Sequence, residues 1–552
     1  MNNIVYRFFS KFRLTAGVTK SIEDRMSIMY PGNREKIIKS TQFEIIRLLI
    51  CNSMILTGFI WFGKMDIYFL FMSAIVMVMV SKNLIYSKYN NMEIKLLKQF
   101  EKFLQDVRFN FRYDGMIDEA LNDALLSADY EMQLQAVKII DSLNKSEESN
   151  GKQYISDGKI VSEDYIEVAP NCFFLTFYAI CQTVKEYGDK VEDGHSAFVT
   201  NLSFLKEDVN IEILKREKIE ALFMGLLFVT IVPLFGIKPI IMWGIGNIPE
   251  LENYYNGIIG KLTYVLLTIM TAFIFQIIMK LKYPLEYENQ KSIWVEQLLT
   301  IPVINRLLLR IISLNYKKYY KMDLFLKSVV YKYNVKEFMV YKFVCGAVAA
   351  ILSVILILKS GIVSLGIFGI LIGFFVFSLS VLIAYNYEMI MILFREKMLR
   401  LNREEEIIRY QSVIMILMNM DRITLEKILE WMEIFAVVFK NTLEKISDTI
   451  AYKGMAVFED AKEKVEFLPF SRLMDSFTAS DRIGINSAFA DVISDRAYYV
   501  EKHKQENEII INNKAMIAKF MAFVPICAVI CFVLIVPFVY VGMKQLQSFT
   551  MI

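Results

Sequence analysis

Seven long apolar stretches constrain this chain more than any other feature of its sequence. They run from Ile45 to Phe62, Ile67 to Val80, Ala221 to Ile237, Leu262 to Met279, Phe343 to Leu358, Ile362 to Tyr385 and Phe520 to Val541. Most approach the ~20 residues that a helix needs to cross a bilayer. Hydrophobic residues make up 55% of the chain, more than a soluble protein of this size normally carries. We therefore expect an all-α, polytopic membrane protein with about seven transmembrane helices.

The second stretch, Ile67 to Val80, is shorter than the others. Its length also fits a re-entrant or interfacial segment. We expect it to span the membrane, because Gly63 to Asp66 have the composition of a tight turn between two helices.

The positions of Lys and Arg predict the orientation, since basic residues in short loops favour the cytoplasmic side. The first 44 residues hold eight Lys or Arg and residues 280–339 hold eleven, whereas the four segments on the opposite side hold five in total. The N-terminus and both large polar regions should therefore be cytoplasmic, and the C-terminus external.

Together these patterns predict eight successive parts of the chain. They are a basic cytoplasmic segment (1–44), a transmembrane hairpin (45–82), a first cytoplasmic helical domain (83–218), transmembrane helices three and four (219–280), a basic cytoplasmic linker (281–339), a second hairpin (340–386), a second cytoplasmic helical domain (387–515), and a last transmembrane helix with a short external tail (516–552).

The second half repeats the order of elements in the first half. Ser196–Phe198 stand before Pro233 at nearly the same spacing as Ser487–Phe489 before Pro525. Each Ser-Ala-Phe is predicted to open a long charged helix that runs into a membrane span. Three crossings in each copy would invert the second one, but the extra span Leu262–Met279 restores its orientation, which predicts a parallel tandem repeat.

The polar regions show apolar residues at three- and four-residue spacing, which predicts helical bundles. The clearest faces contain Leu97, Phe100, Phe103 and Leu104 in the first region, and Val413, Ile416, Leu417 and Met420 in the second.

Residues 280–339 are basic, with eleven Lys or Arg against five acidic residues, and aromatic residues alternate with lysine around Tyr316 to Lys321. Two interpretations are open. The segment could form a helix on an anionic membrane surface, or it could be a linker whose lysines keep it in the cytoplasm.

The sequence lacks the common catalytic patterns. It has two histidines, His195 and His503, and no phosphate-binding Gly-x-x-x-x-Gly-Lys-Ser/Thr loop. Its paired acids lie among lysines and arginines, as on solvated helix faces. A net charge of +3 does not indicate the strongly basic surface that is typical of nucleic-acid-binding proteins. We expect no enzyme activity, no metal, no cofactor and no nucleic-acid partner.

A membrane transporter and a membrane-bound signalling scaffold are the alternatives. Coupled transporters generally place ionisable groups inside the bilayer, but none of the seven stretches contains Asp, Glu, Lys or His. A sensor would need an external ligand domain, and the longest external segment, Lys238–Lys261, is too short to fold alone. Both alternatives are therefore weaker.

The two halves resemble a known family at scattered positions. In the first half these are Lys98, Gln99, Phe100, Tyr187, Gly188, Asp189, Lys190, Lys218 and Pro233, and in the second Gln411, Pro469, Phe470, Asp481, Arg482, Ala488, Phe489 and Pro525. The chain is similar to the F family of type II secretion and type IV pilus systems, and most similar to the B and C platform proteins of tight-adherence (Tad/Flp) pili fused in tandem. It departs from such domains at Phe100 and Asp114-Gly115, where they often have Leu-Pro and a Gly-Ser-like turn.

This resemblance implies a platform protein of the cytoplasmic (inner) membrane, in contact with the lipid bilayer, that couples a cytoplasmic hexameric secretion ATPase to the extraction and assembly of pilin-like subunits. A central platform would also self-associate. Eight residues are candidates for the ATPase-facing surface: Tyr187, Gly188, Asp189, Lys190, Arg472, Asp475, Asp481 and Arg482. The same residues also fit ordinary turns and helix caps.

Overall fold

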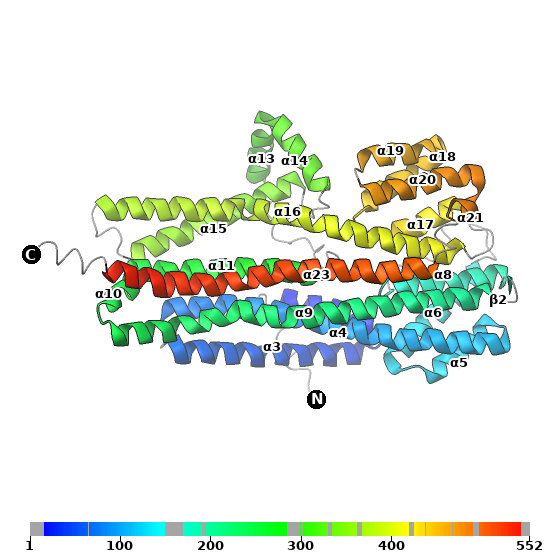
Figure 1. The fold of residues 1–552 in the computed structure, drawn as a ribbon, viewed down its shortest axis with the longest axis horizontal. Helices are drawn as coiled ribbons and strands as arrows, with labels where there is room; N and C mark the ends of the chain where they lie inside the picture. Colours follow the sequence, from blue (N-terminus) through cyan, green and yellow to red (C-terminus); the bar gives the residue numbers. More distant parts are fainter. Residues whose placement is uncertain are drawn as a thin grey trace, which may run out of the picture. The chain divides into compact units, whose positions relative to one another are not determined.

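The computed structural model describes residues 16–63, 66–149, 169–189, 191–192, 195–283, 299, 302–328, 334–360, 367–418, 424–436, 438–465, 467–489 and 496–542. These residues are almost entirely helical (Figure 1), which confirms the expected all-α class. The β structure among them is one antiparallel hairpin, in which β1 (Val191–Glu192) pairs with β2 (His195–Ser196).

The first half contains α2 (Ala16–Met29), α3 (Arg34–Gly63), α4 (Ile67–Asp114), α5 (Ile117–Ser127), α6 (Tyr130–Ser149), α8 (Cys172–Tyr187), α9 (Ala197–Asn247), α10 (Leu251–Tyr255) and α11 (Ile258–Lys282). The second half contains α13 (Pro302–Leu314), α14 (Tyr316–Ser328), α15 (Val335–Ser360), α16 (Ile367–Met418), α17 (Leu425–Phe435), α18 (Lys440–Lys453), α19 (Ala456–Lys464), α20 (Leu468–Ile483), α21 (Ile485–Ala488) and α23 (Arg496–Val529), which continues into the π-helical segment η3 (Ile530–Ile535).

Five helices of the described chain are long and apolar enough to cross a membrane. They are α3, α4, α9, α11 and α23 with its continuation, and they suggest a multi-pass membrane protein. The other two predicted spans fall in α15 and α16, and residues 361–366 between these helices lie outside the described residues. The count of seven spans therefore stays a prediction.

The chain divides into two compact units. The first comprises Met1–Thr57, Met77–Leu222 and Glu404–Ala515, and the second Gly58–Val76, Phe223–Arg403 and Met516–Ile552. The predicted domain boundaries after residues 82 and 386 fall inside the uninterrupted helices α4 and α16. Helices α4, α9, α16 and α23 each contribute residues to both units.

Both predicted cytoplasmic regions contribute to one hydrophobic cluster in the first unit. The expected apolar face of α4 is buried, and its spacing recurs on α16. The buried positions are Leu97, Phe100, Phe103, Leu104 and Val107 on α4, and Ile407, Tyr410, Val413, Ile414 and Leu417 on α16. Of the predicted face on α16, Val413 and Leu417 are thus buried, the Ile416 side chain is not described, and Met420 lies outside the described residues.

Further helices of the two halves match in length. Helices α5 and α17 have 11 residues each, and α8 and α20 have 16 each. Gly188 and Gly484 end the longer pair at φ 81° and 80°, and their N–H groups donate to Val184 and Ser480. A positive φ of this kind favours glycine. The two helices therefore end in the same backbone conformation.

Helices α8 and α20 differ in how much of their surface is covered. Every residue from Phe174 to Gln182 on α8 is buried, which explains why the central part of this helix is mostly apolar on all sides. On α20 the buried residues form one face around Phe470 and Phe477, while Arg472 and Asp475 are exposed.

The second Ser-Ala-Phe does not open a stalk helix, so this part of the prediction is wrong. Ser196 caps the start of α9, where its hydroxyl accepts from the N–H of Val199 at 3.0 Å. Ser487 and Phe489 instead belong to the short helix α21 and its C-cap, and the long helix α23 begins at Arg496. Phe198 and Phe489 are nevertheless both 1% exposed, so the shared feature is a buried aromatic residue.

Candidate functional site

The first group of predicted surface residues lies at the junction between α8 and α9. Asp189 accepts a hydrogen bond from the N–H of Phe198 at 2.9 Å, which satisfies a donor in the first turn of α9. Gly188 forms the C-cap of α8. The side chain of Tyr187 is not described, and Lys190 lies outside the described residues. The geometry thus gives Asp189 a capping role.

The second group lies on the exposed face and at the C-terminal end of α20. Arg472, Asp475, Asp481 and Arg482 are all exposed. Asp475 pairs with Lys462 of α19 at 2.6 Å. Hydrogen bonds from Lys462 to Asp475 and Glu459 raise the pKa of its amine, although an ion pair this exposed stabilises the fold little.

The structure does not join the two groups into one site. In the described part of the chain, no hydrogen bond or ion pair connects Gly188 or Asp189 with the residues of α20. The groups instead occupy corresponding positions near the ends of two helices of equal length, α8 and α20.

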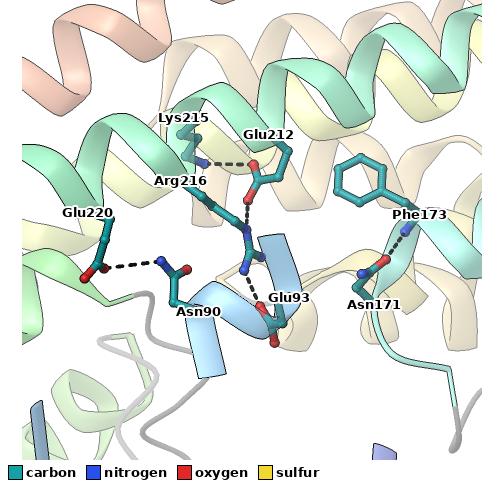
Figure 2. A network of polar contacts seen from close by, with 8 residues as sticks. All are labelled: Asn90, Glu93, Asn171, Phe173, Glu212, Lys215, Arg216 and Glu220. Atoms are coloured by element: carbon teal, nitrogen blue, oxygen red, sulfur yellow. Dashed lines mark hydrogen bonds and ion pairs between the residues drawn. The ribbon is translucent and has the colours of Figure 1, made fainter. Parts of the chain in front are cut away.

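A charged network that the sequence did not predict lies on α9, before this helix enters its apolar part (Figure 2). Glu212 pairs with Lys215 at 3.4 Å and accepts from Arg216 Nε at 2.8 Å. The same guanidinium reaches Glu93 of α4, so one arginine bridges two carboxylates on two helices.

Further contacts extend the connection between α4 and α9. Glu220 accepts from Ser87 at 2.8 Å and from Asn90 at 3.4 Å. Lys98 pairs with Glu217 at 2.6 Å. Successive turns of α9 therefore carry a polar link to α4, and these links lie next to the predicted membrane boundary.

Glu212 is held in its ionised form. Burial alone would raise the pKa of this carboxyl, but the charges of Lys215, Arg216 and Arg409 outweigh burial and lower the pKa to about 2. Because Arg409 belongs to α16, the electrostatic environment of Glu212 includes a residue from the second half of the chain.

Ion pairs connect α9 with α23. Lys504 lies 3.9 Å from Glu207, and Lys218 contacts Glu508. The pairs follow the same order along both helices, so α9 and α23 run side by side in the same direction within the first unit (Figure 1). Each pair is partly exposed, and its contribution to stability is small.

Glu406 of α16 holds the turn between α17 and α18. This carboxylate is 3% exposed and accepts from the N–H groups of Val438 and Phe439 at 2.6 and 3.0 Å. It also accepts from the hydroxyl of Tyr410. Burial raises the pKa of Tyr410, and the adjacent Glu406 adds to this effect. Glu406 therefore has a structural role, although paired acids in this sequence are predicted to lie on solvated helix faces.

Only part of this network could be inferred from the sequence. The spacing of Glu212 and Arg216 permits an i,i+4 pair on a helix, but Glu93 lies 123 residues before Arg216, and no local signal connects them. Within the described residues, no three His, Cys, Asp or Glu side chains are grouped to hold a metal ion. Comparison of the chain with protein-family models, curated proteins and solved structures finds no match.

Proposed function

We propose that this chain is the platform protein of a Tad/Flp-type pilus or type II-like secretion machine in the cytoplasmic membrane. In this proposal the N-terminus and both helical bundles lie in the cytoplasm and the C-terminus lies outside. The bundles would couple a cytoplasmic hexameric ATPase to the extraction of pilin-like subunits from the bilayer.

One observation carries the proposal: two bundles with helices of matched length each lead into a long helix with an apolar continuation. These long helices, α9 and α23, run in parallel beside each other within the first unit. A parallel pair supports the proposal that both bundles lie on one side of a membrane, where one cytoplasmic motor could engage them. The matched α5 and α17, and α8 and α20, support a duplication.

Capture of the membrane-embedded full chain tests the proposal. Mild detergent extraction, affinity capture and mass spectrometry should recover a hexameric ATPase and a pilin-like subunit. Solute uptake into vesicles that contain the purified chain should equal uptake into empty vesicles. Solute accumulation without capture of either partner would contradict a platform and favour a transporter.

The partner-facing residues require a separate variant, and the exposed α20 side chains suit it best. D481R should reduce ATPase capture while membrane levels stay normal. Asp448 of α18 is exposed in the same bundle, so D448R provides a matched charge reversal that should leave capture unchanged. Asp189 is less suitable, because its capping bond to Phe198 makes a loss of capture ambiguous. Equal capture by wild type and D481R would remove Asp481 from the interface.

A further inference from the structure

Helices α13 and α14 carry an exposed mixture of basic, aromatic and aliphatic side chains. Together they contain six basic residues and one acidic residue. The exposed fractions of the large apolar side chains are 46% for Leu309, 74% for Leu314, 64% for Tyr316 and 53% for Tyr320. Among them lie the exposed basic side chains of Arg306, Arg310, Lys317 and Lys321. Exposed apolar groups at this density mark a binding surface.

The second unit places this surface beside the ends of two predicted spans. Phe343 begins the fifth span and Tyr385 ends the sixth, and their rings lie 5.9 Å apart. Helix α14 packs against α15. Its Lys318 lies close enough to Lys342 for their charges to interact. Tyr319 of the same helix likewise lies close to Tyr385. Helix α14 is therefore at the level where α15 and α16 enter their apolar parts.

The direction of the hairpin agrees with this position. In Figure 1, α13 and α14 lie across the direction of α15 and α16. A helix that lies across spanning helices, at the level of their ends, runs along the membrane surface and not through it. Tyrosine is enriched at this depth, because its ring prefers the apolar side and its hydroxyl the polar side.

The charges on α13 and α14 indicate what kind of partner this surface binds. Arg306, Arg310, Lys317 and Lys321 form no ion pair within the described residues. Basic side chains beside a span are attracted by anionic lipids of the cytoplasmic leaflet. Interleaved leucine and tyrosine provide the shallow apolar contact that an interfacial helix needs.

We propose that α13 and α14 form an interfacial anchor on the cytoplasmic leaflet. Leu309, Leu314, Tyr316 and Tyr320 enter the boundary between headgroups and acyl chains, and the neighbouring basic residues contact anionic headgroups. The anchor goes beyond the platform role, because it assigns a lipid-binding function to the segment between the two halves.

Spin labels on the full chain test this anchor. In a cysteine-free background, one label replaces Tyr320 and a control label replaces Tyr452, an 89% exposed residue of α18. Both variants are placed in phosphatidylcholine vesicles with and without phosphatidylglycerol, and in amphipol, which offers no extended bilayer surface. Collisions with oxygen and with a water-soluble nickel complex report the depth of each label.

The anchor predicts that the label at 320 is protected from nickel and accessible to oxygen in anionic vesicles, while the label at 452 stays accessible to nickel. Protection should be lost in amphipol and in K317E/K321E, but kept in K445E, which reverses an exposed charge on α18. Equal nickel access at both positions would overturn the proposal. Protection that persists in amphipol would also overturn it, since the contact would then be with protein. Protection that is independent of phosphatidylglycerol would do the same.

Discussion

Replacing Tyr255 with phenylalanine should loosen the last helix, because the Tyr255 hydroxyl donates to the backbone carbonyl of Val533 at 2.7 Å. In a regular α-helix this carbonyl would accept from residue 537, but Pro537 has no N–H. The helix is locally π-helical at this point, and the N–H of Val536 donates to Cys531. Tyr255 thus supplies a donor where proline removes one.

The cost follows from the burial of both partners. Tyr255 is 2% exposed and Val533 is 1% exposed, so water replaces the lost hydroxyl poorly. A buried acceptor left without its donor costs about 1–3 kcal/mol, and measured hydrogen bonds between membrane helices lie at or below the lower end of this range. We expect Y255F to cost about 1–2 kcal/mol, which corresponds to a roughly 5- to 30-fold larger open population.

Hydrogen exchange of the full chain in nanodiscs measures this opening at residues 526–542. A double-mutant cycle with P537A gives the sharper test, because alanine restores the missing N–H. Y255F should then cost clearly less in the P537A background. Tyr254 packs its ring 5.3 Å from Tyr540, so Y254F is a matched loss of a neighbouring hydroxyl that should spare the Val533 carbonyl. Equal costs of Y255F in both backgrounds would show that proline and tyrosine are not coupled.

Four further variants probe the first unit. Glu212 has its pKa lowered from 4.5 to about 2, so E212Q should lower the free energy of unfolding by on the order of 3 kcal/mol near neutral pH. This difference should vanish as the pH falls from about 4.5 through about 2, in denaturant titrations that compare wild type and variant. E406A leaves the buried N–H of Phe439 and the partly buried N–H of Val438 without an acceptor, so it should cost about 2–4 kcal/mol and speed exchange in the α17–α18 turn. G188A and G484A should each lower the free energy of unfolding by about 1–3 kcal/mol. The two losses, measured by chemical unfolding, should be similar because the two glycines share one backbone conformation.

The helical faces of the bundles could be predicted because burial imposes a local period on the sequence. Leu97, Phe100, Phe103 and Leu104 recur at helical spacing, and all four are buried. The prediction at Ser487 rested on a short motif and was wrong, because such a motif does not determine whether a helix continues. Helix α21 ends at Ala488 and α23 begins at Arg496, although Phe489 keeps its buried position.

The polar contacts were beyond sequence analysis for a different reason. Arg216 meets Glu93 from 123 residues away, and Tyr255 meets Val533 from 278 residues away. Such pairs depend on how the helices pack, and charged residues are common enough in this sequence that many pairings are compatible with it. Asp189 was expected on a partner surface, yet its carboxylate caps α9. A side chain near a helix end serves the backbone as readily as it serves a partner.

The unequal covering of α8 and α20 predicts two different patterns of tolerated variation in helices of the same length. Leu175, Ala179 and Ile180 are buried on the side of α8 that faces away from Phe174, so polar replacements there should be selected against. Arg472 and Arg482 on α20 are exposed, so their identities should vary unless something binds them. If the exposed residues of α20 stay the same among natural variants, a binding partner is indicated. If the residues of α8 stay the same, only packing is indicated.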